Sequence, residues 1–574
     1  MKNQEIADIL YKMAELLEMQ DVQFKPYAYQ KAAGMLEGLE EDIEDIYSKG
    51  GHKSLKALPG IGESIARHIE EYLKKGEIKE YEKLKKRFPF DIGEIVRIEG
   101  MGPKKAKKLW KELGIKNVKE LEKAAKAHKI AGLEGFGEKT EQNILEGIEF
   151  LKRGKGRFLL NEIIPRIRII EDKLKKFKEV ERLAVAGSAR RMKETIGDAD
   201  LLAISSNPKK VMNFFTSQPE VARIWGKGNT KSSVRVKEGF DIDLRVVKKD
   251  QFGSALQYFT GSKEHNIAVR RVAMEKGMKL SEYGLFKGKK RIAGETEESI
   301  YKALGMEMMP PEIREGQGEV EASLKAELPK VIGYGDIKGD LHIHSNWDGG
   351  TDSIEDIARV AQKMGYRYAG IADHTKFLKI ENGLDEKELE KRNKEIDKLN
   401  RIQKNFRILK GAETNILKDG SIDIRDDSLG KLDFVIAGIH SNFKMSKEEM
   451  TERIIKAIKN PNVDIISHPT GRILKRRDEY EIDFDKILRA AKEFNVALEI
   501  NSHPERLDLN DQNIRRAKEA GVKMVINTDA HFIGHLGYME FGIAQARRGW
   551  AEKEDILNVR PVAELLNFFN KTCL

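Results

Sequence analysis

The sequence has a single cysteine among its 574 residues, Cys573, beside the last residue. One cysteine excludes an internal disulfide and a cysteine-based zinc ribbon, so any metal ion must be held by histidine and carboxylate side chains. The sequence also lacks an apolar run of the roughly 20 residues that a membrane span needs, and its first residues lack the pattern of a secretory signal. We therefore expect a cytoplasmic protein that makes no contact with membranes.

Charge is abundant. Charged side chains make up 34% of the residues and the net charge is +10. This balance suits a polyanionic partner such as nucleic acid, although a soluble basic protein without such a partner would share it. A chain of this length is too long for one hydrophobic core, so several domains are expected.

Three turns in the first 150 residues repeat one pattern, in which glycine, a hydrophobic residue and a second glycine precede a helix. They are LPGIGESIA (58–66), IEGMGPKKA (98–106) and LEGFGEKTE (133–141). Such a turn exposes backbone N–H groups that bind phosphate without reading bases. The turns resemble helix-hairpin-helix motifs; the alternative is a helical bundle with glycine caps. The predicted DNA contacts are Gly60, Gly62, Gly100, Gly102, Lys104, Lys105, Gly135 and Gly137.

From about residue 155 to 305, short β-branched runs alternate with helical stretches, which predicts an α+β domain. Two runs carry aspartates, GDADLL (197–202) and FDIDLR (240–245). Alternate residues of a strand share a face, so Asp198 and Asp200 point together and Asp243 offers a third carboxylate. Phosphoryl transfer requires carboxylates of this kind to hold metal ions, although an isolated DxD also occurs at solvated strand edges.

Upstream, Gly187 and Ser188 form a small turn followed by two arginines, a suitable cradle for a triphosphate. With the aspartates, this order resembles a family X DNA polymerase. The resemblance implies that Asp198 and Asp200 bind two Mg²⁺ or Mn²⁺ ions, and that Asp243 completes the catalytic metal site and accepts the proton of the primer 3′-hydroxyl. It also implies nucleotide contacts at Gly187, Ser188, Arg191, Gly197, Tyr258, Phe259, Gly261, Asn266 and Arg270. Packing or surface roles would equally explain Tyr258, Phe259 and Arg270.

One position departs from that family. The lysine that forms a Schiff base in the family's 5′-deoxyribose-phosphate lyase falls at His68, which cannot supply an amine. Lys25 and Lys31 offer amines nearby in the sequence, in a different geometry. The sequence therefore disfavours lyase activity.

Eight of the twelve histidines lie between residues 342 and 535, most of them at the ends of predicted strands. In βα folds the carboxyl ends of the strands assemble the active site. A single histidine is usually an ordinary polar residue, but this repeated placement indicates a site. Mixed imidazole and carboxylate ligands suit manganese, zinc or iron. The predicted ligands are His342, His344, Asp348, His374, Glu413, His440, His468, Asp529 and His531.

This order of ligands resembles a PHP domain (polymerase and histidinol phosphatase), which bacterial-type family X polymerases carry. The resemblance implies up to three Mn²⁺, Zn²⁺ or iron ions, two of them bridged by Glu413. The family's Ser-Asp-Gly reads Asp348-Gly349-Gly350 here, so Asp352 competes with Asp348 for the ligand position. His503 and Arg506 are candidate phosphate contacts, and we expect His535 to be structural.

These patterns predict a multidomain chain. We expect a helical lyase-like domain with helix-hairpin-helix turns (1–90), a second helix-hairpin-helix subdomain (91–150), an α+β nucleotidyltransferase palm (151–245), a subdomain that contacts nucleotide and template (246–305), a linker (306–337) and an α/β PHP domain forming a distorted (βα)7 barrel (338–574).

The predicted function is gap-filling DNA synthesis in base excision repair, combined with a metal-dependent 3′→5′ exonuclease that could extend to blocked 3′ ends or abasic sites. The predicted partners are gapped or nicked DNA and deoxynucleoside triphosphates, bound by a monomer. Two alternatives stay open. One is a PHP-type small-molecule phosphatase fused to a DNA-binding module, and the other is a non-catalytic scaffold that binds DNA ends.

Overall fold

The computed structural model describes residues 2–569, with gaps at 21, 23, 38, 40, 41, 59, 89–94, 97, 99, 100, 154 and 155. Gly100 and Cys573, both named above, lie outside the described residues. Along the described chain, no helix combines the length and apolar character that crossing a membrane requires.

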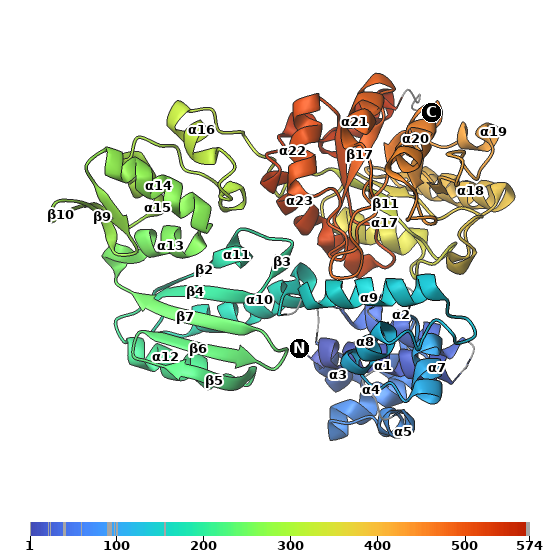
Figure 1. The fold of residues 1–574 in the computed structure, drawn as a ribbon, viewed down its shortest axis with the longest axis horizontal. Helices are drawn as coiled ribbons and strands as arrows, with labels where there is room; N and C mark the ends of the chain where they lie inside the picture. The colour runs from blue at the N-terminus through green and yellow to red at the C-terminus, as the bar shows by residue number, and fades with distance from the viewer. Residues whose placement is uncertain are drawn as a thin grey trace.

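The N-terminal region is helical and shares one buried core. The predicted glycine turns lead into helices: Gly62 caps α4, Gly102 caps α7, and Gly137 directly precedes α9. The helices are α1 (Lys2–Met19), α2 (Lys25–Glu37), α3 (Ile43–Lys56), α4 (Glu63–Lys75), α5 (Lys79–Arg87), α7 (Pro103–Leu113), α8 (Val118–Lys126) and α9 (Glu138–Arg153). Helix α9 runs between this region and the C-terminal domain (Figure 1), where Lys444 bonds its Asn143.

The expected palm is built on a five-stranded sheet of order β2-β4-β7-β6-β5. Only β4 and β7 pair in parallel. The DADLLAI alternation buries Ala199, Leu201 and Ala203 in the core beneath the sheet, as period 2 predicts. The elements are β1 (Phe158–Leu159), α10 (Leu160–Lys176), β2 (Arg182–Ala186), α11 (Gly187–Arg190), β3 (Thr195–Ile196), β4 (Asp198–Ile204), α12 (Pro208–Thr216), β5 (Val221–Lys227), β6 (Lys231–Val236) and β7 (Asp241–Val247).

A smaller subdomain follows the palm. It contains η1 (Lys249–Gln251), α13 (Phe252–Thr260), α14 (Lys263–Glu275), β8 (Lys279–Ser281), β9 (Gly284–Lys287), β10 (Lys290–Ala293) and α15 (Glu297–Ala303). Residues 306–337, expected as a linker, carry η2 (Pro311–Ile313) and α16 (Glu319–Lys325). Met309, Ile313 and Val320 are buried in the same core as Val269 and Tyr301. Much of the expected linker is therefore packed onto this subdomain.

The C-terminal domain is a closed parallel barrel. Its strands form two sheets, β11-β12-β13 and β14 through β18, and every pairing in them is parallel. Single bridges, His374 to Glu413 and Ile343 to Ala530, join the two sheets at both edges. Because β13 and β14 are halves of one interrupted strand, the circuit has seven members and matches the expected distorted (βα)7 barrel.

The barrel elements alternate strand and helix. The strands are β11 (Gly339–Ile343), β12 (Tyr368–Ile371), β13 (Arg407–Lys410), β14 (Glu413–Asn415), β15 (Ile436–Gly438), β16 (Ile465–Ile466), β17 (Ala497–Asn501) and β18 (Met524–Asn527). The helices are α17 (Ile354–Lys363), η3 (Lys379–Glu381), α18 (Glu386–Ile402), α19 (Asp426–Leu429), α20 (Lys447–Ile458), α21 (Phe484–Glu493), α22 (Asp511–Ala520), η4 (Ile533–Tyr538), α23 (Met539–Arg548), η5 (Lys553–Asp555), η6 (Leu557–Val559) and α24 (Val562–Phe568).

Apolar side chains fill the amino-terminal part of the barrel. The ring of Phe434 occupies the space where a Cβ atom of Gly370 or Gly411 would lie, within 2.6 Å of either position. Phe434 shares its core with Tyr368 at the start of β12 and with Leu565 of α24. Helix α24 therefore covers this end of the barrel, and the carboxyl ends of the strands form the other.

The barrel and the palm are joined by ion pairs. The carboxylate of Glu194, just before β3, accepts hydrogen bonds from Arg472 (2.6 Å) and Gln545 (2.7 Å) of the C-terminal domain. Arg548 of α23 lies 2.8 Å from Glu315, which also binds Arg191 of the palm. Neighbouring positive charge holds the pKa of Glu194 below its usual range despite burial. We call this group of six residues the inter-domain clamp: Glu194, Glu315, Arg191, Arg472, Gln545 and Arg548.

We expect Arg472→Met to lower the free energy of unfolding by about 2 kcal/mol or more, because the substitution leaves the Glu194 carboxylate charged but without its arginine donor. The matched control is Arg476→Met, whose side chain is 45% exposed and 3.7 Å from Glu505. That change should cost less than about 0.5 kcal/mol. Urea unfolding of both variants checks the prediction, and equal losses would contradict the clamp.

Candidate catalytic sites

The predicted carboxylates meet at one edge of the palm sheet. The parallel register of β4 and β7 places Asp200 opposite Asp243 and Asp198 opposite Asp241. The Asp241 carboxylate accepts hydrogen bonds from Arg235 Nε (2.8 Å) and from Trp225 Nε1. Asp243 is contacted by the Lys231 ammonium at 2.9 Å. The structure thus brings the three predicted ligands, Asp198, Asp200 and Asp243, together on neighbouring strands.

The turn before this edge depends on a glycine. Gly187 has a φ of +66°, and a Cβ atom there would lie 2.7 Å from a carboxylate oxygen of Asp200. A side chain at this position would be strained and would clash with the carboxylate. Gly187 and Ser188 thus begin α11 directly against Asp200. Burial raises the pKa of Asp200 to about 6, and the carboxylates of Asp198 and Asp243 act in the same direction.

The structure brings together two predicted nucleotide contacts that are distant in the sequence, Arg191 and Gly261. The Arg191 guanidinium bonds the carbonyl of Thr260, and a Cβ atom on Gly261 would lie 3.2 Å from it. Arg191 is buried and also lies 2.9 Å from Glu315, a partner that the sequence did not indicate. Its neighbour Arg190 bonds Thr260 and Glu297.

The other predicted contacts lie on α13 and α14. Asn266 donates a hydrogen bond to the Tyr258 carbonyl (2.7 Å), and Arg270 donates to the Asn266 carbonyl (3.1 Å). Phe259 packs under the Arg245 guanidinium, whose central carbon is 4.5 Å from the ring centroid. Helices α13 and α14 thus flank the Gly261–Ser262 turn, which lies beside Arg191. Gly197 lies apart, one residue before β4.

In the barrel, Glu413 is the centre of a histidine cluster. One carboxylate oxygen lies 3.0 Å from His468 and 3.3 Å from His440. The other lies 2.9 Å from His374 and 3.3 Å from His342. All five side chains are buried or nearly so. This arrangement allows Glu413 to serve two neighbouring ligand groups at once.

The remaining predicted ligands complete the cluster on its other side. His344 Nε2 lies 3.3 Å from Asp529, and the His344 ring stacks on His531 with centroids 4.1 Å apart. Several sets of three offer ligand atoms within 4.8 Å of one another: His344, His374 and His531; His342, His344 and Asp529; His374, Glu413 and His440; and His344, Asp348 and Asp373. The strand ends have therefore assembled every predicted ligand in one place.

Asp348 and Asp352 lie in different surroundings. Asp348 accepts hydrogen bonds from His344 Nδ1 (2.7 Å) and from the His374 backbone N–H (2.7 Å). Asp352 instead binds the Thr351 hydroxyl and the Ile533 N–H. The structure therefore places Asp348 in the cluster, where it also orients His344.

Behind the ligands lie two carboxylates and an amide that were not predicted from the sequence. Glu499 lies 2.7 Å from His342 Nδ1 and accepts from the His468 N–H. Asn415 lies 2.7 Å from His440 Nδ1. Asp373 pairs with the buried Arg392. A signal was present for Glu499, because a charged residue inside the apolar run VALEIN needs a buried partner.

The electrostatics of the cluster favour cations. Burial disfavours charge on Glu413, yet His342, His440 and His374 hold its pKa well below the usual range. Burial likewise opposes protonation of His344, but Asp348 raises its pKa to about 10. His342 Nε2, His344 Nε2, His374 Nδ1 and His440 Nε2 are buried and lie 2.9–3.3 Å from the carboxylate of Glu413 or Asp529, yet none makes a hydrogen bond. Imidazole nitrogens that face ionised carboxylates in this way fit divalent metal ions.

The candidate phosphate contacts lie at one side of the cluster. Arg506 is 3.4 Å from Asp529, so its positive charge reaches the cluster. His503 packs edge-on against His535 and Tyr538. Burial lowers the pKa of His503 and holds that of His535 well below the usual range. His535 thus belongs to an aromatic stack, in line with a structural role.

The predicted lyase position is a half-buried imidazole. His68 lies 5.9 Å from the Tyr29 ring, and burial lowers its pKa. Lys31 donates instead to the Thr351 carbonyl of the C-terminal domain at 3.1 Å, and Lys25 is exposed. The positive charge of Lys25 nevertheless acts on His68 and also lowers its pKa, and the Lys31 stem packs against Gly60 in the turn before α4.

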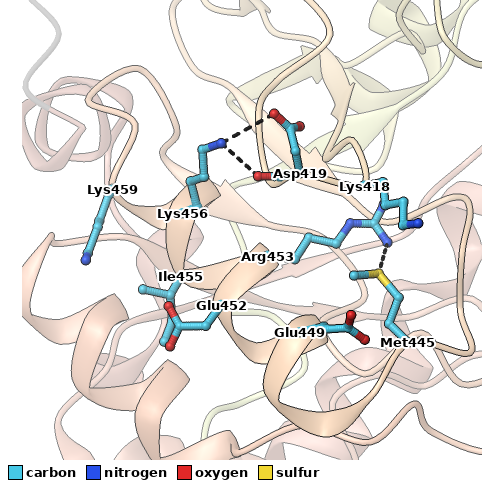
Figure 2. A pocket seen from close by; sticks show the side chains of 9 residues that line it. All are labelled: Lys418, Asp419, Met445, Glu449, Glu452, Arg453, Ile455, Lys456 and Lys459. Atoms are coloured by element: carbon cyan, nitrogen blue, oxygen red, sulfur yellow. Dashed lines mark hydrogen bonds and ion pairs between the residues drawn. The ribbon is translucent and has the colours of Figure 1, made fainter.

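A separate surface pocket lies beside α20 (Figure 2). Charged side chains line much of it, including Lys456, which binds Asp419, and Arg453, which contacts Met445. None of the nine predicted metal ligands lines it. We therefore assign it no part in the cluster.

Comparisons with known proteins agree with this organisation. Family models match as a helix-hairpin-helix domain (1–78), a SAM-like helix-hairpin-helix tandem (92–149), a DNA polymerase beta thumb (255–315) and a PHP domain (340–503). The "DNA polymerase/3'-5' exonuclease PolX" of Bacillus subtilis (strain 168) is 38% identical over 579 residues, covering 100% of both chains. A probable phosphatase of Thermoanaerobacter sp. (strain X514) is 38% identical over 161 residues, which is 26% of this chain and 63% of that protein.

Because the pKa of Asp200 is raised to about 6, ionisation of its carboxylate lowers the free energy of unfolding. This loss is complete above about pH 6 and disappears as the pH falls toward 4. In chelator at pH 8, we expect Asp200→Asn to stabilise the protein by about 1–2 kcal/mol, after allowance for solvent screening. At pH 4 the gain should vanish. Asp241→Asn is the matched contrast, because Arg235 lowers the pKa of Asp241 and its loss should destabilise. Thermal melts that rank the two variants alike would contradict this.

Proposed function

The chain belongs to the PolX family of DNA polymerases, and from that premise we propose that it fills gaps in DNA and trims 3′ ends at a second site. The observation that carries the proposal is the separation of two phosphate-handling clusters, one on β4 and β7 and the other at the carboxyl ends of the barrel strands. A single-activity enzyme would need only one of them.

At the palm, Asp198 and Asp200 would hold two Mg²⁺ or Mn²⁺ ions, and Asp243 would complete the catalytic ion's site. These ions supply charge stabilisation for the transferring phosphoryl group. Asp243 then takes the proton of the primer 3′-hydroxyl, and Gly187 and Ser188 bind nucleotide phosphates through their backbone and hydroxyl. Arg191 binds the same phosphates after its ion pair with Glu315 breaks. The Glu315 carboxylate then keeps Arg548 and Lys193 as cationic partners, so it is not left unneutralised.

At the barrel, the nine predicted ligands would hold up to three Mn²⁺, Zn²⁺ or iron ions, with Glu413 shared between two. The ions supply Lewis-acid activation of water and of the scissile phosphodiester. Arg506 neutralises the phosphate, while Glu499 and Asn415 fix the tautomers of His342 and His440. The substrate we propose is the 3′ terminus of DNA, extending to blocked ends and abasic sites.

The helix-hairpin-helix turns support DNA binding in gap repair. Gly62 and Gly102 cap helices whose N-termini are exposed, and Lys104 and Lys105 begin α7. We propose that the protein acts as a monomer in the cytoplasm on gapped or nicked DNA with deoxynucleoside triphosphates, and that it lacks lyase activity. The phosphatase-like relatives match about a quarter of the chain, so a small-molecule phosphatase leaves the palm unexplained.

We expect the two activities to separate by substitution. On a 5′-labelled primer at a one-nucleotide gap, Asp198→Ala should lose extension and keep degradation, because it disables only the palm. His344→Ala should do the reverse. The control is Asp419→Ala, an exposed carboxylate outside both sites, which should retain both activities. Loss of both activities in either site variant would contradict two independent sites.

The lysines of α7 should act through phosphate charge. Replacing Lys104 and Lys105 with alanine should weaken binding of gapped DNA equally for different sequences, and should reduce the slope of log K against log salt by about 2. Lys83→Ala, an exposed lysine on α5 with a 73% exposed side chain, is the control and should leave the slope unchanged. Fluorescence anisotropy over a salt series measures it. A sequence-dependent loss would argue against contacts restricted to the phosphate backbone.

A further inference from the structure

The N-terminal helical region reaches the rim of the histidine cluster. Tyr27 of α2 donates to the Gly349 carbonyl at 3.4 Å, and Lys31 donates to the Thr351 carbonyl at 3.1 Å. The Thr351 N–H in turn bonds the carbonyl of His531, a cluster member. Helix α2 therefore stands beside the cluster, although more than 300 residues separate them in the sequence.

A loop of the barrel approaches the same place. Residues 375–384 follow His374 directly, and a Cβ atom on Gly349 would lie 2.2 Å from the carboxylate of Glu381 in this loop. Gly349 is thus in contact with both the loop and Tyr27. Both segments therefore lie at the rim of the cluster, beside Gly349.

Four large apolar side chains on these two segments are exposed. Phe24, one residue before α2, is 86% exposed and Tyr27 of α2 is 50% exposed, while Phe377 is 46% and Ile380 84% exposed in the loop. Large apolar side chains gathered at one place on a surface indicate a binding function. Lys25, exposed on α2, adds positive charge to the same rim.

We propose that these four side chains, with Lys25 and Lys31, form a stacking platform for the unpaired 3′-terminal nucleotides of DNA. Exposed aromatic faces bind bases of any sequence, provided that the bases are unpaired, and lysines track the phosphates. Duplex DNA keeps its bases stacked within the helix and cannot use such faces. The platform also adjoins the histidine cluster, the proposed site of phosphodiester cleavage, which favours a nucleic-acid strand over a protein partner.

In this arrangement the N-terminal lyase-like domain takes part in binding the nuclease substrate. It rests on the proposed exonuclease function and adds that α2 supplies part of the nuclease's substrate site. Lys31, an amine that the sequence offered for Schiff-base chemistry, is directed at the barrel rim instead. Terminal nucleotides would lie between α2 and the loop, with the last phosphodiester directed to the cluster.

The test uses the full chain with Mn²⁺ and a 5′-labelled dT oligonucleotide. Phe24→Ala combined with Phe377→Ala should raise KM for the oligonucleotide about tenfold, because two stacking faces are lost. Its kcat for bis(4-nitrophenyl) phosphate should stay within twofold, since that small diester needs no platform. Phe24→Trp with Phe377→Trp should restore KM. The matched control is Phe494→Ala, a 41% exposed aromatic after α21, which should behave as the parent.

Failures of the platform and of the exonuclease are distinguishable. If the parent degrades the oligonucleotide and the double alanine variant keeps the parent KM, the platform is overturned and the nuclease stands. If the parent degrades no DNA, the proposed exonuclease fails. Anisotropy of the labelled oligonucleotide in chelator then decides the platform: binding about tenfold weaker in the double variant supports it, and equal binding overturns it.

Discussion

The inter-domain clamp is the constraint on which the two-site arrangement depends. Glu194 and Glu315 come from the polymerase half, yet their cationic partners Arg472 and Arg548 belong to the barrel. Glu194 lies between α11 and β3, in the segment that follows the proposed phosphate contacts Gly187 and Ser188, so the barrel anchors that segment. Arg548 also donates to the carbonyl of Arg191, a proposed nucleotide contact. The barrel therefore contributes to the structure of the palm.

Both sites solve one electrostatic problem in different ways. Each must concentrate carboxylates where cations will bind, at a cost in self-repulsion. In the palm, burial raises the pKa of Asp200, and the repulsion from Asp198 and Asp243 raises it further. In the barrel, imidazoles surround Glu413 and hold it ionised. Bound cations would therefore relieve more repulsion between carboxylates in the palm, whereas the barrel cluster is organised in advance by its own hydrogen bonds.

Much of this could be predicted because the signals are local. The alternation in DADLLAI sets the aspartates on one face, and histidines at the ends of apolar runs mark the barrel site. Contacts between distant segments leave no such pattern. Glu315 as the partner of Arg191, and α2 beside Gly349, result from domain packing. The segment 306–337 has the prolines and glycines of a linker, yet the burial of Met309 and Ile313 packs it into a core.

Phe434 and α24 close the amino-terminal end of the barrel with apolar side chains. A ligand therefore approaches Glu413 from the carboxyl ends of the strands, the side on which α2 contacts Gly349. Because the barrel interior is packed and is no pore, whatever binds at the histidine cluster and whatever is released from it must use this same side of the domain.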